Sequence, residues 1–70
     1  MSDAQIIETI DMILDGRALR SKPRIHRENG AFAVYANVYN ADRMGFQDTM
    51  LACFDDVNTA VRIKNRLAFR

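Results

Sequence analysis

The residues with reactive side chains are few, because the 70-residue chain has one cysteine, Cys53, and one histidine, His26. Nucleophilic catalysis needs a thiol or hydroxyl beside a base that a third group orients. Cys53 stands in an apolar run, which predicts a packed, reduced core residue, and His26 is expected two strands away from it. Paired cysteines for zinc are excluded, and one histidine offers too few ligands for another metal. We therefore predict a protein that is not an enzyme and uses no metal or cofactor.

A second group of residues with functional chemistry is basic. Five positive charges and no acidic residue occur within segment 17–27, which we call the basic segment. Such a segment can bind phosphates or the acidic surface of a protein, or it can serve only to protect an exposed edge strand from aggregation. The net charge of the whole chain is +1, which argues against a strongly cationic nucleic-acid binder. The charged residues of the segment are Arg17, Arg20, Lys22, Arg24 and Arg27.

A third group is aromatic. Tyr35 and Tyr39 flank Asn37 at alternate positions of a strand-like segment, so all three side chains are expected on one face of a strand. Exposed tyrosines on a sheet can stack on bases or anchor a protein interface. The simpler interpretation is that the tyrosines are present because they favour the strand conformation and cover a thin sheet.

The element that precedes the basic segment is predicted to be a helix over residues 3–15. Ser2 and Gln5 have the spacing of a capping box, and Gly16 is suited to the left-handed conformation that ends a helix. One face of this helix is apolar and the opposite face is acidic. The simpler interpretation of the acidic stripe is a solvated helix face, and the alternative is a surface that docks on a basic partner. The apolar stripe consists of Ile6, Ile7, Ile10, Ile13 and Leu14, and the acidic stripe of Glu8, Asp11 and Asp15.

Two turn signals divide the middle of the chain into three strands. Asn29-Gly30 is typical of a tight two-residue hairpin, and segment 40–45 contains residues that favour a second turn. We therefore expect strands over residues 24–28, 31–39 and 46–54. Alternation predicts which of their side chains face the helices. The inward residues are expected to be Phe32, Val34, Ala36 and Val38, followed by Phe46, Met50, Ala52 and Phe54 with Asp48 among them, which leaves Leu51 and Cys53 outward.

The chain ends in a second predicted helix over residues 56–69. Asp55 and Asp56 provide a cap and a favourable charge at its amino end. The result is a single α+β domain, residues 1–70, with the order α-β-β-β-α: a three-stranded antiparallel meander with two helices packed on one face. The other face is expected to be open and to carry Tyr35, Asn37 and Tyr39.

Sequence features also predict where the protein resides. The start of the chain lacks the basic region that precedes the apolar core of a secretory signal, and the apolar runs are too short to span a bilayer. A lone cysteine favours a reducing compartment. We expect a cytoplasmic protein that does not enter a membrane.

The order of elements resembles two groups of proteins. Across the whole chain it is similar to the double-stranded-RNA-binding domain, which grips phosphates through a lysine-rich stretch at the start of its last helix. Here that start is 55–59 (Asp-Asp-Val-Asn-Thr), where the acids repel a phosphate backbone. The chain also resembles small phage-encoded inhibitors, the anti-CRISPR proteins among them, in its short length, its basic segment and its tyrosine-bearing face. That resemblance implies a protein that masks a nucleic-acid-binding surface or a subunit contact of a larger complex in the host cytoplasm.

The leading hypothesis is thus a non-enzymatic protein-interaction module of the inhibitor or adaptor type. Tyr35, Asn37 and Tyr39 are expected to form a central aromatic patch, beside which basic residues steer an acidic partner into place. Pairing of two copies through the open face is a further option. The alternative is a small nucleic-acid-binding module that uses the basic segment. The steering residues are Arg20, Lys22, Arg24 and Arg27.

Overall fold

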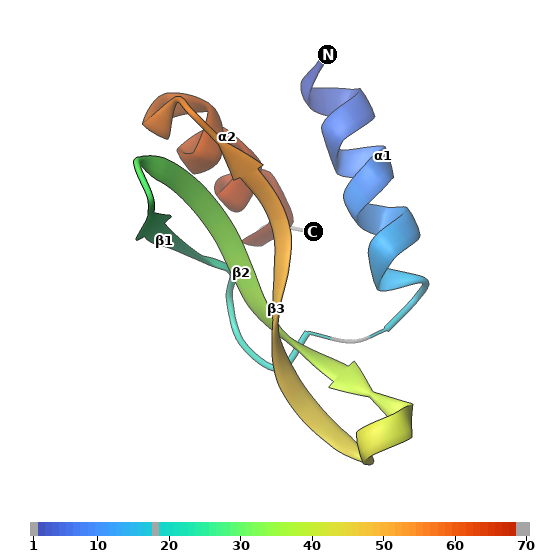
Figure 1. Cartoon of the computed structure of the whole chain (residues 1–70). Helices are drawn as coiled ribbons and strands as arrows, with labels where there is room; N and C mark the ends of the chain where they lie inside the picture. The colour runs from blue at the N-terminus through green and yellow to red at the C-terminus, as the bar shows by residue number, and fades with distance from the viewer. Residues whose placement is uncertain (1, 18, 69–70) are drawn as a thin grey trace.

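The structure, a computed structural model, describes residues 2–17 and 19–68. It confirms the predicted α+β class and the order α-β-β-β-α, with strand order β1-β2-β3 and an open sheet (Figure 1). Residue 69, the last of the predicted second helix, lies outside the described residues. The elements are α1 (Asp3–Leu14), β1 (Arg24–Glu28), β2 (Ala31–Asn40), a 3₁₀ turn (Ala41–Arg43), β3 (Gly45–Phe54) and α2 (Val57–Ala68).

Helix α1 is held at both ends by local hydrogen bonds. The backbone N–H of Gln5 donates to the Ser2 hydroxyl over 3.2 Å, and the N–H of Ser2 donates to the Gln5 side chain over 2.9 Å, which completes the predicted capping box. The helix ends at Asp15, which is left-handed at φ 49°. The Arg17 guanidinium donates to the carbonyls of Ile13 and Leu14 over 2.6 and 2.9 Å. This cation compensates the negative end of the helix dipole.

Helix α2 is capped by Asp56 and tied to α1 by Arg62. The Asp56 carboxylate accepts hydrogen bonds from the Thr59 hydroxyl and from the backbone N–H groups of Asn58 and Thr59, and these bonds lower its pKa. Arg62 donates to both carboxylate oxygens of Asp3 over 3.1 and 3.3 Å. Neither of the two α-helices in the described residues is long and apolar enough to cross a membrane.

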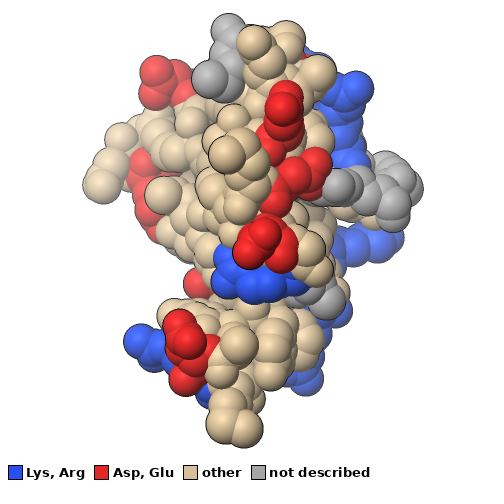
Figure 2. All heavy atoms as spheres, turned by 90° about the vertical axis from the view of Figure 1, so that its right-hand side faces the viewer, with Lys and Arg blue, Asp and Glu red and all other residues tan. Residues whose placement is uncertain are grey.

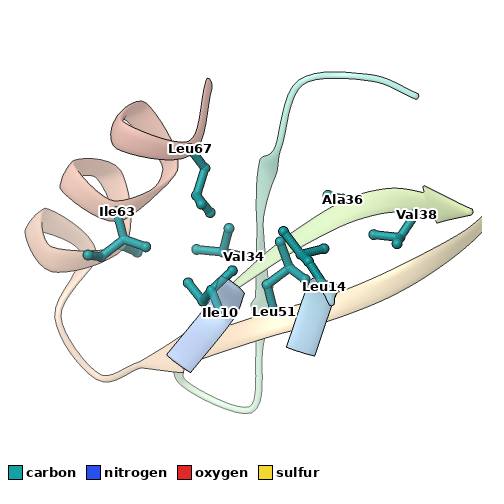
Figure 3. Close-up of a cluster of buried hydrophobic side chains, with 9 residues drawn as sticks. Ile10, Leu14, Val34, Ala36, Val38, Leu51, Ile63 and Leu67 are labelled. Carbon is teal, nitrogen blue, oxygen red and sulfur yellow. The ribbon is translucent and has the colours of Figure 1, made fainter. Parts of the chain in front are cut away.

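The core lies between the helices and one face of the sheet. Asn29 and Gly30 have φ values of 50° and 78°, so the predicted two-residue hairpin joins β1 to β2. The core is a cluster of buried apolar side chains from both helices and from the two long strands, β2 and β3 (Figure 3). Both helices therefore lie on the same face of the sheet. The members of the cluster are Ile10, Leu14, Val34, Ala36, Val38, Leu51, Ala60, Ile63 and Leu67.

A bulge in β3 overturns part of the predicted strand orientation. Val34 pairs with Ala52 but the next residue of β2, Tyr35, pairs with Met50, so Leu51 is an extra residue on β3. Leu51 is buried in the core, whereas Met50 is exposed. Because side chains alternate along a strand, the extra residue reverses the two faces on its amino-terminal side. Phe46 and Met50 therefore point away from the helices and not toward them as predicted, whereas Ala52 and Phe54 pack on the core as predicted.

The connector between α1 and β1 bonds to the part of β2 that β1 does not reach. Strand β1 pairs only with residues 31–35 of β2. Farther along, Leu19 forms an isolated antiparallel bridge with Val38, and the N–H of Arg20 donates to the Asn37 carbonyl over 2.9 Å. The hairpin of β2 and β3 thus extends past β1 toward the 3₁₀ turn (Figure 1).

Candidate functional site

The face of the sheet opposite the helices is open, and we call it the outer face. Its members follow from the strand pairing, because paired residues of neighbouring strands point to the same side. This face contains both predicted tyrosines, and the bulge adds two apolar residues of β3. Its residues are Arg24, His26 and Glu28 of β1, Ala31, Ala33, Tyr35, Asn37 and Tyr39 of β2, and Phe46, Asp48, Met50 and Cys53 of β3.

At the β1 end of the outer face, five side chains form a polar network: Arg24, His26, Glu28, Tyr35 and Asp48. The Arg24 Nη2 atom lies 2.7 Å from Asp48 Oδ2, and the Tyr35 hydroxyl donates to Glu28 Oε1 over 2.9 Å. The Arg24 guanidinium carbon lies 5.7 Å from the centroid of the Tyr35 ring, and His26 meets the same ring edge-on at 5.9 Å. The hydrogen bond to Glu28 raises the pKa of Tyr35, because it stabilises the neutral phenol.

Cys53 and His26 lie in one row of the outer face, since both flank Ala33 of β2. Cys53 is exposed, so the prediction of a packed core cysteine is wrong, whereas the outward position that alternation assigned to it is confirmed. Ala33 is buried although it belongs to the open face. The Tyr35 hydroxyl reaches Glu28 near the end of β1, so the tyrosine ring extends across Ala33.

Tyr39 and Phe46 are exposed apolar side chains at the hairpin end of the outer face. Met50 is exposed on the same face farther along β3, with Asp48 between it and Phe46. We call Tyr39, Phe46 and Met50 the apolar strip. These side chains are 39, 41 and 49% exposed, respectively. Tyr39 and Phe46 are cross-strand partners whose ring centroids lie 5.6 Å apart in an edge-to-face arrangement. The guanidinium carbon of Arg20 lies 5.5 Å from the centroid of the Phe46 ring. An arginine thus stacks on the aromatic pair and borders the strip.

Asn37 lies on β2 between Tyr35 of the polar network and Tyr39 of the apolar strip. It is the cross-strand partner of Asp48 and is partly buried. Its Oδ1 atom is buried and accepts no hydrogen bond from any described residue. The predicted polar centre between the two tyrosines is therefore an unsatisfied acceptor, which costs free energy in the isolated protein.

The basic segment does not form one continuous cationic surface. Arg17 is engaged with the end of α1, and Arg24 is paired with Asp48. Arg27 points to the helix side of the sheet, where it lies over the ring of Phe32. Lys22 lines a hollow at the carboxyl end of α2. Of the predicted steering residues, only Arg20 and Arg24 reach the outer face and join Tyr35, Asn37 and Tyr39 there.

Sequence reasoning missed Phe46 and Met50 as surface residues. Strict alternation assigned them to the core together with Asp48. A carboxylate on an inward face was the available signal that the register of this strand changes, because an unpaired buried charge is strongly disfavoured. The structure resolves this conflict by turning Asp48 outward to Arg24.

The described residues hold no group of three or more His, Cys, Asp or Glu side chains placed to bind a metal ion. Comparison of the chain with family models, curated proteins and solved structures found no match. The outer face, with its polar network and its exposed apolar side chains, is thus the candidate functional site.

Proposed function

We propose that this protein is a non-enzymatic protein-interaction module that binds its partner through the apolar strip of the outer face. The observation that carries the proposal is the exposure of the paired Tyr39 and Phe46 and, on the same open face, of Met50, with Arg20 stacked on Phe46. Tyr, Phe, Met and Arg are the residue types enriched at protein interfaces, and aromatic residues and arginines carry much of the binding energy there.

The charge balance of the outer face supports a protein partner rather than nucleic acid. Arg20 and Arg24 are accompanied on this face by the carboxylates of Glu28 and Asp48. Since Arg24 already pairs with Asp48, Arg20 remains as the cation that can meet a carboxylate of the partner. A phosphate backbone is attracted by clustered positive charge, and the two carboxylates oppose it. The partner surface therefore has an apolar centre and an acidic residue near its rim.

The biological role that we propose for this contact is inhibition. It rests on the resemblance in size and plan to the small phage-encoded inhibitors of the anti-CRISPR type, which block a large complex by surface contact. The partner in this proposal is a component of a nucleic-acid-processing complex in the host cytoplasm, whose functional surface the outer face masks.

The test is affinity capture from a bacterial lysate, run with and without nuclease, with tagged wild-type protein and two paired variants. One variant combines Phe46→Ala with Met50→Ala and removes the strip. Its matched control combines Val57→Ala with Val61→Ala, which truncates similarly exposed apolar residues on α2. We expect a stoichiometric protein partner that survives nuclease, is retained by the α2 variant and is lost by the strip variant.

Two outcomes contradict the proposal. Equal capture of the partner by the two variants would place the contact away from the strip. Recovery of nucleic acid alone, abolished when Arg20, Lys22, Arg24 and Arg27 are neutralised, would establish the nucleic-acid-binding alternative. Truncation of a central interface residue commonly costs more than about 1 kcal/mol of binding free energy. The loss of affinity caused by a double truncation is therefore large enough to detect.

A further inference from the structure

A second exposed apolar surface lies away from the outer face, between the end of α1 and the tip of the hairpin. A hollow of about 410 Å³ is bounded there by Met12, Ile13, Asp15 and Arg17 on one side and by residues 40–42 on the other. The space-filling view in Figure 2, which faces α1, shows the molecule narrowing between its larger upper part and a smaller lower part.

The apolar residues of this hollow are not used by the core. Met12 is 75% exposed and Ile13 is 40% exposed, although Ile13 was predicted to belong to the buried stripe of the helix. The stripe that reaches the core consists instead of Ile10 and Leu14, supported by the partly buried Ile6 and Ile7. Met12 and Ile13 thus present two large apolar side chains at one point of the surface. Unbranched methionine adapts readily to the shape of a bound apolar group.

The rim of the hollow is acidic. Asp15 lines it from the end of α1 and Asp42 from the 3₁₀ turn. The carboxylates of Glu8 and Asp11 extend the negative surface along α1, where Figure 2 shows a column of acidic side chains. Arg17 is the opposing charge, but its guanidinium is held against the carbonyls of Ile13 and Leu14 and compensates the helix end. Two carboxylates, those of Asp15 and Asp42, therefore line the hollow beside the apolar residues and one engaged cation.

We propose that this acidic hollow docks an apolar side chain presented by a lysine- or arginine-rich segment of a protein partner. The apolar group covers Met12 and Ile13, and the flanking cations meet Asp15 and Asp42. Charge complementarity selects this occupant, because the rim repels acidic proteins and phosphate backbones and accelerates the approach of a basic segment. The inference does not depend on the apolar strip, which lies on another face and borders an arginine.

The experiment uses the full chain and a fluorescein-labelled peptide with a leucine pair flanked by lysines, followed by fluorescence anisotropy. A second peptide has serines in place of the leucines, and a third has glutamates in place of the lysines. We expect saturable binding of the leucine–lysine peptide, binding at least about tenfold weaker for the serine peptide, and none for the glutamate peptide. A tenfold change corresponds to about 1.4 kcal/mol, within the range of one central contact.

Variants locate the binding site. Met12→Ser with Ile13→Ser removes the apolar floor, and Asp15→Asn with Asp42→Asn removes the charge of the rim. Asparagine tolerates the left-handed conformation of Asp15, so the second pair preserves the backbone. We expect each pair to weaken the leucine–lysine peptide at least about tenfold. Val57→Ser with Val61→Ser serves as the apolar control and Asp55→Asn as the acidic one, and both are expected to bind as the wild type does.

Three results would overturn the proposal. The first is no binding of the leucine–lysine peptide. The second is equal affinity for the serine peptide, which would mean general attraction between lysines and an acidic surface. The third is equal weakening by the control variants, which would place the contact elsewhere. Circular dichroism of each variant establishes that a loss of binding is not a loss of fold.

Discussion

Leu51 and Met50 provide the sharpest test of the structure, because the bulge exchanges the roles that simple alternation gives them. Alternation without a bulge buries Met50 and exposes Leu51. The structure has the opposite arrangement, with Leu51 4% and Met50 49% exposed. Truncating each residue to alanine in turn therefore distinguishes the two registers through the free energy of unfolding.

The expected magnitudes differ clearly. Leu51 belongs to the core cluster, and a buried leucine truncated to alanine loses about 2–5 kcal/mol, the sum of lost apolar burial and the remaining cavity. Met50 leaves no closed cavity because half of its side chain already contacts solvent, so its truncation is expected to cost about 1 kcal/mol or less. A domain of this size rarely has more than about 3–5 kcal/mol of stability, so Leu51→Ala is expected to consume most of it.

Thermal and urea unfolding followed by far-ultraviolet circular dichroism measure both effects. In a chain of this length, 1 kcal/mol shifts the melting temperature by about 4–8 °C. We expect a loss of at least about 8 °C for Leu51→Ala and a smaller loss, at most about 8 °C, for Met50→Ala. A larger loss for Met50→Ala than for Leu51→Ala would refute the bulge, and with it the exposure of the apolar strip.

Two further predictions concern ionisable groups. The hydrogen bond from Arg62 lowers the pKa of Asp3 below its ordinary value of 3.8, so the stability contributed by this pair is present above that pH and is lost as the pH falls through the lowered value. Urea unfolding is expected to show Asp3→Asn less stable than the wild type at pH 7, and the two proteins should converge in acid; an unchanged difference there would refute the assignment. The hydrogen bond to Glu28 raises the pKa of Tyr35. In a Tyr39→Phe background, Glu28→Ala is expected to lower the midpoint of the phenolate absorbance titration, and an unmoved midpoint would mean that this bond does not form.

The order of elements could be predicted from local signals, because each of those signals acts within a few residues. The capping box at Ser2, the Asn29-Gly30 turn and the cap at Asp56 each satisfy backbone groups of their own neighbourhood, and all three occur as expected. The bulge could not be predicted in this way. Its position depends on which residue of β3 completes the core above Val34, and that contact joins residues distant in sequence.

The candidate site could be predicted only in part for a related reason. Alternation along β2 places Tyr35 and Tyr39 on one face wherever the sheet pairs, so these two residues were found. The basic segment was interpreted as one surface because its charges are adjacent in sequence. In the structure, Arg24 and Arg27 point to opposite sides of β1, and Arg17 is bound to the end of α1. Proximity along the chain does not decide the direction of a side chain.

The bulge is the device that connects fold and proposed function. Without the extra residue, Phe46 and Met50 would share a face with Ala52 and Phe54 and would be available to the core. With it, the inward positions near the hairpin tip fall to the polar Gln47 and Thr49 and the two large apolar side chains are exposed. A domain with so small a core gains stability from every buried apolar group, so this arrangement costs stability in the isolated chain.

Such a cost is recovered only where the exposed side chains become buried against another surface. The two ends of the outer face differ in this respect. At the β1 end, Arg24 and Asp48 pair with each other and Tyr35 bonds to Glu28, so the polar groups there already satisfy one another. At the hairpin end, Tyr39 and Phe46 of the apolar strip are exposed. A partner is therefore expected to centre on Tyr39 and Phe46 and to leave the hydrogen bond between Tyr35 and Glu28 intact, which makes the Tyr35 titration in a Tyr39→Phe background an internal reference. Its midpoint should remain the same when the partner binds, and a shift would extend the contact to the network.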